Sequence, residues 1–347
     1  MSRIQYHAFG FCVLALVYSS AADAASPIPT QSPAIVEHAL DRYWDESLSG
    51  GPPKDGIPSI DDPRFQGAEQ ADRWLDDDDQ IIGLYHNGRA RAYPQSILVW
   101  HEIVNDKFGD DALAITYCPL TGTALGFKRG EDELGVSGRL VNSNLIMYNR
   151  ETDTYWPQIL GAGIHGPQKG QGLQEVRVIW TDWASWQARH PDTEVLSRRT
   201  GHARNYRRDP YGGYGPKTGY YAGGGTVFPV FERSERFTEK HEVFGFRTAD
   251  ESVAVDPAVL ADAGTLRYEG KQDDFLIIHD PELDTGWIFR APRGELPDDE
   301  ELANVTFKAS GPASPALDKL EAVNGFEAMW FAWYAFYPNT AVIDALE

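Results

Sequence analysis

Two short stretches in the first half of the chain carry side chains that could do chemistry: WHEIVND (100–106) and YCPLTGT (117–123). A cysteine with a nearby histidine can act as nucleophile and base. A thiolate and an imidazole, with a weak methionine ligand such as Met147, can also hold copper. We therefore predict His101, Glu102 and Cys118 as candidate catalytic residues, with His101 and Cys118 as candidate ligands of a single transition metal.

Each stretch also has an interpretation without chemistry. WHEIVND can be a helix on which His101 and Asn105 share a face and bond a nearby loop. It is not a zinc-protease motif, because the second histidine of His-Glu-x-x-His is replaced by Asn105. Pro119 and Gly122 predict a turn, so Cys118 lies at a strand end, where a buried apolar cysteine is equally expected.

Further along, polar residues in two segments are candidates for ligand binding. Within 135–166, the side chains of Asn142, Ser143 and Asn144 could line a cleft or satisfy the backbone of a turn, and His165 lies between two glycines, where a surface position is the default. The stretch RRTGHARNYRRDPYGGYGPK (198–217) is basic. It either docks on the acidic body of the protein or supplies an anion site that includes Arg204, Arg207 and Arg208.

The composition excludes several functional classes. The net charge is −21, which argues against nucleic-acid binding and leaves a small molecule or a protein as the expected partner. We find no Gly-rich nucleotide loop, no Gly-x-Ser-x-Gly elbow and no zinc quartet, so we expect no nucleotide cofactor. A single transition metal remains the one cofactor that the residues suggest. No stretch is long and apolar enough for a transmembrane helix.

Residues 1–25 predict export. Arg3 precedes the apolar run AFGFCVLALVYS (8–19), and AADAAS supplies small residues for cleavage. We expect a periplasmic or extracellular protein that loses Cys12 with the signal peptide. Cys118 would then be the one cysteine left, and it could form no disulfide within the chain.

Three pairs of similar blocks, in the same order, indicate an internal duplication. IIGLYHNGRARAYPQSIL (81–98) resembles VFGFRTADESVAVDPAVL (243–260), NLIMYNRETDTYWP (144–157) resembles FLIIHDPELDTGWI (275–288), and WASWQARHPDTEV (183–195) resembles WFAWYAFYPNTAV (330–342). The first block predicts a β-hairpin. The third predicts a short helix with tryptophans at i and i+3, on its buried face.

The blocks define the expected organisation of the chain. An N-terminal extension (26–71) precedes copy one (72–197), a basic and Gly/Tyr-rich connection (198–241), and copy two (236–347). The offset falls from 162 (243 minus 81) to 131 (275 minus 144), so copy two lacks a segment near 113–143 that includes YCPLTGT. With abundant aromatic residues and glycine, we predict a mainly β (α+β) fold of two pseudo-symmetric halves with short helices and long loops.

The chain resembles the bacterial domain-of-unknown-function family 3179. The likeness covers RAYPQSILVWHEIVND (91–106), ITYCPLTGTALGF (115–127), GVSGRLVNSNLIMYNRETDTYW (135–156), DPYGGY (209–214) and WFAWYAFYPNT (330–340). The family implies no established activity. Relatives often have Cys-Pro-Leu-Cys-Gly, whereas this chain has Thr121 at the second cysteine, which rules out a dithiol here.

Two functional hypotheses follow from these residues. The first is an exported protein with a thiol, metal or small-ligand site in copy one, centred on His101 and Cys118. The second is a non-catalytic ligand-binding or scaffolding protein in which Cys118 belongs to the core. The residues alone do not decide whether the protein is an enzyme.

Overall fold

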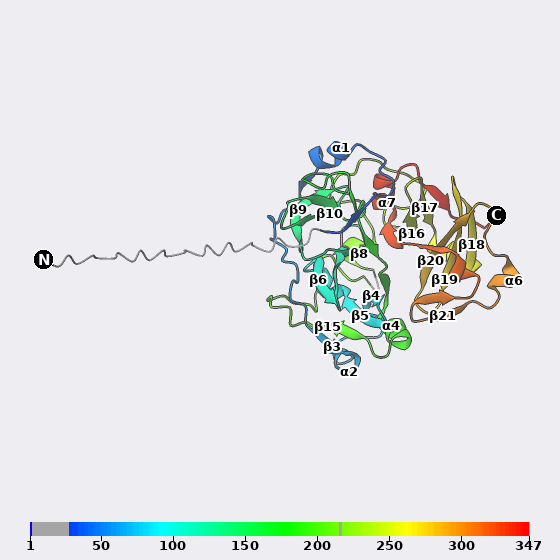
Figure 1. Cartoon of the computed structure of the whole chain (residues 1–347), viewed down its shortest axis with the longest axis horizontal. Coiled ribbons are helices and arrows are strands. Elements are labelled where there is room, and N and C mark those ends of the chain that lie inside the picture. Colours follow the sequence, from blue (N-terminus) through cyan, green and yellow to red (C-terminus); the bar gives the residue numbers. More distant parts are fainter. Residues whose placement is uncertain (2–27, 215–216, 347) are drawn as a thin grey trace.

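Strands make up most of the regular structure of this chain, as the sequence predicts. The computed structural model describes residues 28–214 and 217–346, together with Met1 (Figure 1). The expected export segment, 1–25, therefore lies outside the described residues apart from Met1. Within the described part, α-helices contain only four to seven residues. No helix there is long and apolar enough to cross a lipid bilayer.

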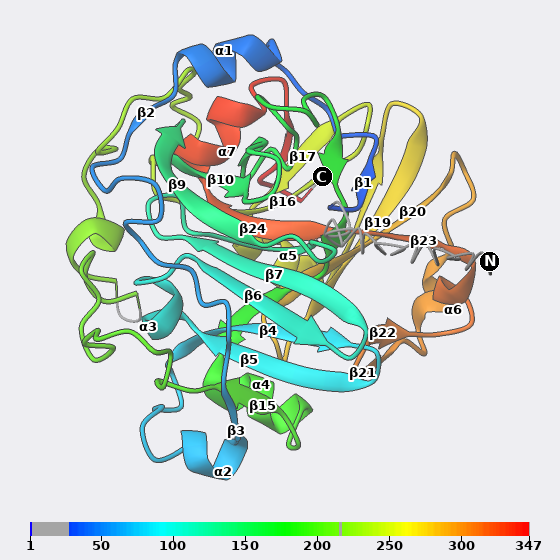
Figure 2. The ribbon, with the colours of Figure 1, turned by 60° about the vertical axis from the view of Figure 1, so that its left-hand side comes forward.

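Five sheets of four or five strands form a propeller-like ring (Figure 2). Sheet I contains β14 (Ile179–Asp182), β4 (Gln80–His86), β5 (Arg89–Pro94), β15 (Glu194–Leu196) and β3 (Phe65–Gly67). Sheet II contains β13 (Glu175–Val176), β8 (Thr123–Lys128), β7 (Asp111–Cys118) and β6 (Ile103–Phe108). Sheet III contains β11 (Tyr155–Pro157), β10 (Asn144–Asn149), β9 (Leu134–Val141) and β2 (Leu48–Ser49).

The other two large sheets come from the second half of the chain. Sheet IV contains β24 (Gly325–Met329), β16 (Glu242–Arg247), β17 (Ser252–Val255) and β25 (Ala341–Ile343). Sheet V contains β18 (Thr265–Glu269), β19 (Asp273–Asp280), β20 (Thr285–Pro292) and β23 (Glu321–Val323). Two small sheets pair β1 (Thr30–Gln31) with β12 (Gly172–Leu173) and β21 (Thr306–Lys308) with β22 (Gly311–Ala313).

Short helices connect or cover these sheets. They are α1 (Leu40–Asp45), α2 (Ala68–Ala71), α3 (Gln95–Leu98), α4 (Trp183–Arg189), α5 (Pro257–Ala263), α6 (Asp299–Leu302) and α7 (Trp330–Phe336), with 3₁₀ turns η1 (Gly219–Ala222) and η2 (Leu317–Lys319). The helices predicted from the tryptophan spacing are α4 and α7. Both begin at the first tryptophan of their block and bury the second.

Sheets I and IV have the same strand order and register over four strands. Gly83 pairs with Ala92 across β4 and β5, and Gly245 pairs with Ala254 across β16 and β17. In each sheet the closing strand, β15 or β25, is parallel to its neighbour. The following helix places a tryptophan over the glycine. A Cβ on Gly83 would lie 2.2 Å from the Trp186 ring.

Sheets III and V share a hairpin with the same turn. The Asp-Thr-x-Trp sequence follows β10 and β19, and its aspartate has positive φ in both places, 52° at Asp153 and 48° at Asp284. Sheet II has no counterpart at this point of the second half, because α5 leads directly into β18. The segment present only in the first half therefore corresponds to the strands between 103 and 128, which includes YCPLTGT.

The connection between the halves lies against the first half of the molecule. The hydroxyl of Tyr220 donates to the carbonyl of Leu120, 2.7 Å away. Further along, Ser143 donates to the carbonyl of Phe228, and the backbone N–H of Phe231 donates to Asn142. The connection thus covers the turn that follows Cys118 and the turn between β9 and β10.

Candidate functional site

Cys118 is a core residue at the end of β7. Its side chain is 1% exposed and belongs to the main hydrophobic cluster. The backbone N–H of Leu145 donates to Sγ at 3.4 Å, and the thiol is 3.9 Å from the carbonyl oxygen of Ser143. Burial, with the nearby charge of Glu102, raises the pKa of the thiol to about 11. A protonated, enclosed thiol is a poor nucleophile, which favours the core interpretation of this residue.

His101 uses both ring nitrogens in hydrogen bonds. Nδ1 lies 2.7 Å from the carbonyl oxygen of Pro58, and Nε2 lies 2.7 Å from the hydroxyl of Tyr206. Burial lowers the pKa of the imidazole to about 4, so the ring is neutral at pH 7. A carbonyl can only accept, so Nδ1 carries the proton and Nε2 accepts from Tyr206.

Glu102 follows His101 in a turn before β6 begins, so WHEIVND is a turn and strand and not the helix considered above. The backbone at Glu102 has a left-handed φ of 60°, and the side chain is 7% exposed. Burial raises the pKa of its carboxyl to about 8. Its charge acts on the thiol of Cys118, whereas the ring of His101 is directed at Tyr206.

These contacts bear on the candidate metal ligands. His101 has no free ring nitrogen in this arrangement, and no group of three or more His, Cys, Asp or Glu side chains in the described ranges is placed to hold a metal. The pairing of His101 with Cys118 around a metal thus stays a prediction from the sequence.

The three polar residues of the β9–β10 turn are buried and bonded to protein. Asn142 donates to the carbonyl of Ala335 in α7 and accepts from the connection. Asn144 donates to Thr121 and Gln158, both at 3.0 Å. These contacts favour the interpretation that the three residues satisfy the hydrogen bonds of a turn over the interpretation that they line a cleft. The exposed His165 stacks on Trp44 of α1, with ring centroids 4.0 Å apart.

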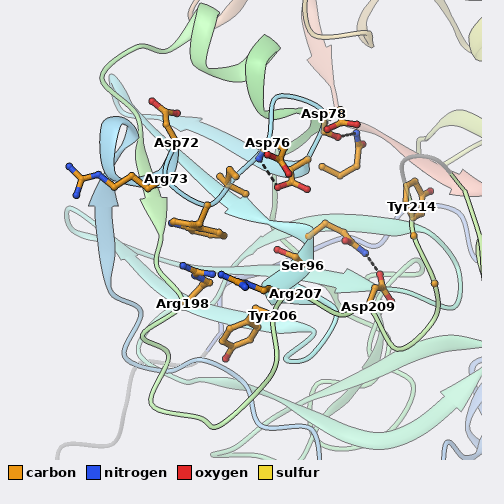
Figure 3. Close-up of a pocket in the computed structure, with 17 residues that line it drawn as sticks. Asp72, Arg73, Asp76, Asp78, Ser96, Arg198, Tyr206, Arg207, Asp209 and Tyr214 are labelled. Carbon is orange, nitrogen blue, oxygen red and sulfur yellow. Dashed lines mark hydrogen bonds between the residues drawn. The ribbon is translucent and has the colours of Figure 1, made fainter.

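A groove of about 670 Å³ opens between the segment that follows α2 (72–80), α3 and the basic connection (Figure 3). Its lining is polar and charged on both sides. It consists of Asp72, Arg73, Trp74, Leu75, Asp76, Asp78, Asp79, Gln80, Gln95, Ser96, Arg198, Tyr206, Arg207, Asp209, Gly212, Gly213 and Tyr214. Arg198 and Arg207 lie side by side, and Asp76 and Asp78 lie on the opposite side of the groove.

Two arginines of the groove, Arg198 and Arg207, differ from other arginines of the described chain in their lack of a carboxylate partner there. Elsewhere, arginines such as Arg91 and Arg189 are within 3.0 Å of carboxylates. Arg198 and Arg207, in contrast, have no Asp or Glu oxygen within 4.0 Å among the residues placed by the structure. The guanidinium of Arg198 lies instead over the ring of Trp74, 4.6 Å from its centroid.

The floor of the groove is a hydrogen-bonded polar cluster. Gln95 donates to Asp209 at 2.9 Å and to the hydroxyl of Tyr117 at 3.1 Å. Tyr221 also donates to Asp209, at 3.3 Å. Burial raises the pKa of Asp209 above its ordinary value. This cluster links the groove to β7, one residue before Cys118.

Tyr206 connects the groove to His101 and to a smaller pocket. That pocket, of about 290 Å³, is lined by Arg198, His202, Ala203, Arg204, Asn205, Tyr206 and Arg207. Arg204, which was predicted as a ligand residue, therefore lies beside the groove. The buried His101 holds Tyr206 in place through a hydrogen bond. Trp74, Arg198, Tyr206 and Asp209 were not predicted as site residues from the sequence. The basic connection was a signal of one side of the groove, but nothing in the sequence indicates that it lies opposite Asp76 and Asp78.

Fold and groove together define a mainly β, propeller-like protein with a charged surface groove and a buried thiol. The chain belongs to the family described as a protein of unknown function (DUF3179), whose profile matches residues 54–340. This confirms the family assignment made from the sequence blocks. No curated protein and no solved structure matches the chain.

Proposed function

We propose that this protein binds a small anionic ligand in the groove. The observation that carries the proposal is the pair Arg198 and Arg207, which face a common groove without carboxylate partners among residues 28–214 and 217–346, in a chain of net charge −21. A planar guanidinium binds carboxylate or phosphate oxygens in a two-pronged fashion. Unpaired arginines in an acidic protein are therefore best explained by an anion that arrives from outside.

Two of the residues predicted from the sequence support the groove without a direct part in binding. His101 holds the hydroxyl of Tyr206, and Arg204 lines the adjoining pocket. The buried thiol of Cys118 supports the non-catalytic alternative for that residue, because its raised pKa keeps it protonated. The proposed role is binding, with Cys118 as core.

Export belongs to the same proposal. The basic start, apolar run and small-residue end of residues 1–25 support a cleaved signal peptide and a periplasmic or extracellular location. N-terminal sequencing of the protein from the cell envelope or the medium would test it. A mature chain that retains residues 1–25 contradicts it.

The two halves are proposed to derive from an internal duplication. The shared register of sheets I and IV and the shared turn at Asp153 and Asp284 support it. So does the repeated Gly–Trp contact, because a Cβ on Gly245 would lie 2.3 Å from the ring of Trp333. Superposition of 72–197 on 236–347 should place Trp156 on Trp287 and Trp183 on Trp330, and failure of both pairs would overturn the duplication.

Calorimetric titration with succinate and with inorganic phosphate at low salt tests the binding proposal. We expect binding to the unaltered protein and at least a tenfold weaker affinity in Arg198→Gln/Arg207→Gln, given about 1.5–3 kcal/mol for each charged hydrogen bond. The matched control is Arg199→Gln/Arg208→Gln, which removes two charges from the same segment but from residues outside the groove lining. No binding to the unaltered protein, or an equal loss in both variants, would overturn the proposal.

A further inference from the structure

We infer that the ligand is a zwitterion, such as an amino acid or a short peptide, bound between two walls of opposite charge. This inference rests on the proposed function and deepens it. The basic wall, Arg198 and Arg207, takes the carboxylate. Across the groove, Asp76 and Asp78 take the ammonium group (Figure 3).

The acidic wall is as free of partners as the basic one. Asp76 and Asp78 are exposed, and no Lys or Arg nitrogen lies within 4.0 Å of either carboxylate in the ranges 28–214 and 217–346. Neither carboxylate accepts a hydrogen bond there, whereas the neighbouring Asp79 accepts one from the backbone N–H of Asp76 at 2.9 Å. The turn is thus fixed by Asp79, and the other two carboxylates are left for a ligand.

An acceptor on the floor of the groove is also available to a ligand. Gln95 is 6% exposed and lines the groove. Its amide nitrogen donates to Asp209 and Tyr117, which fixes the side chain. Its Oε1 has no donor among the described side chains and backbone. An N–H group of a bound ligand can donate to this oxygen.

The two walls also select against simpler ligands. Opposite charges of the protein face the same groove without pairing with each other. A simple anion therefore binds to the arginines but is repelled by the aspartates, so its affinity is lower than that of a zwitterion. A zwitterion is attracted at both ends. Selectivity for it depends on the repulsion of singly charged ligands by the wall of like charge as well as on attraction by the opposite wall. The volume of about 670 Å³ lies within the range of small-ligand sites.

Three forms of one tripeptide separate the contributions of the two ends. The probes are Gly-Gly-Gly, its N-acetylated form, which lacks the ammonium, and its C-terminal amide, which lacks the carboxylate. We expect the zwitterion to bind about fivefold more tightly than the acetylated form, as for one partly exposed ion pair. The affinity of the zwitterion should exceed that of the amide by a larger factor, because two arginines contact the carboxylate that the amide lacks.

The variant Asp76→Asn/Asp78→Asn isolates the acidic wall. Neither side chain has a hydrogen bond to lose within the described protein, so the fold should be retained, and thermal unfolding checks this. We expect the zwitterion and the acetylated form to bind this variant equally. The matched control, Asp262→Asn/Asp318→Asn, changes two exposed aspartates of the second half and should keep the fivefold preference.

The outcomes distinguish this inference from the proposed function. If the acetylated tripeptide binds the unaltered protein as tightly as the free one, and Arg198→Gln/Arg207→Gln weakens both, the zwitterion inference is wrong and the anion site stands. If the amide binds as tightly as the zwitterion and the arginine variant has no effect, the ligand is a cation and both proposals are wrong. If no tripeptide form, succinate or phosphate binds, both are also wrong.

Discussion

The hydroxyl of Tyr206 lies 2.7 Å from Nε2 of His101 and joins the basic connection to the core. On the far side of the ring, His101 is held by the carbonyl of Pro58. On the near side, Tyr206 also bonds Thr200. Since Tyr206 gives its proton to His101, the hydroxyl of Thr200 must donate to Tyr206. A directional chain of hydrogen bonds therefore fixes the segment that carries the groove arginines.

Removing the imidazole should destabilise the protein and loosen this segment. For His101→Ala we expect a loss of about 2–3 kcal/mol in the free energy of urea unfolding at pH 7, because Tyr206 and the Pro58 carbonyl lose buried partners. Cleavage within 198–208 by trypsin should be faster. The control, His165→Ala, removes an exposed stacked ring and should cost less than about 1 kcal/mol. Equal losses would show that His101 is no anchor.

The same histidine should make the protein sensitive to acid. Its pKa is about 4 when folded and near 6.5 when unfolded, so the folded state favours the neutral ring. The resulting stability is present above pH 6.5 and is lost as the pH falls through about 4. The stability of His101→Gln should fall less than that of the unaltered protein between pH 6.5 and 4, measured by urea unfolding. If the free energies of unfolding of the variant and the unaltered protein change in parallel with pH, His101 is not the group that causes the acid sensitivity.

Glu102 should have the opposite effect at alkaline pH. Its pKa rises from 4.5 to about 8 on folding, so the protonated carboxyl favours the folded state. This contribution is fully present below pH 4.5 and is lost as the pH rises through about 8. We expect Glu102→Gln to match the unaltered protein near pH 4 and to exceed it by about 4 kcal/mol at pH 9. An unchanged difference across this range would mean that the carboxyl is hydrated.

Cys118 should resist thiol reagents while the protein is folded. With a thiol pKa of about 11, about one molecule in a thousand carries a thiolate at pH 8, and the sulfur is enclosed. Iodoacetamide should therefore label the native protein far more slowly than the urea-unfolded protein, as followed by mass spectrometry. Labelling at comparable rates would restore the interpretation of Cys118 as a reactive site.

The repeated Gly–Trp contact predicts equal sensitivity at two distant glycines. In Gly83→Ala and Gly245→Ala the new Cβ would lie 2.2 and 2.3 Å from the rings of Trp186 and Trp333, both fully buried. We expect each change to cost about 2–3 kcal/mol of unfolding free energy, since packed rings have no room to move. Gly67→Ala is the control, because nothing lies within 4 Å of its Cβ and its φ of −73° is ordinary.

Local patterns were sufficient to predict several elements of the fold. Alternation with a His-Asn-Gly-Arg turn predicts the hairpin of β4 and β5, and the tryptophan spacing predicts α4 and α7. The Pro-Leu-Thr-Gly turn predicts that a strand ends at Cys118, which the structure confirms. In each case the deciding interactions lie within a few residues along the chain.

The groove could not be predicted in this way, because its walls come from distant segments. Arg207 was interpreted as part of a segment that could dock or bind an anion, and nothing local in the sequence places that segment opposite Asp76. Only the packing of the connection against α3 brings the two together. Likewise, His101 and Cys118 are close along the chain, but the ring of His101 bonds Tyr206 whereas the thiol of Cys118 accepts from Leu145.

The parallel closing strands of sheets I and IV have a consequence for the order of folding during synthesis. In sheet I, Arg91 of β5 contacts Glu194 of β15, which is 103 residues later in the chain. In sheet IV, Val253 of β17 pairs with the distant Ala341 of β25. Until these later strands join, each half presents an unpaired strand edge, which invites pairing with other chains. Contacts this distant also slow folding. Each of these sheets is therefore complete only when the last strand of its half has joined it.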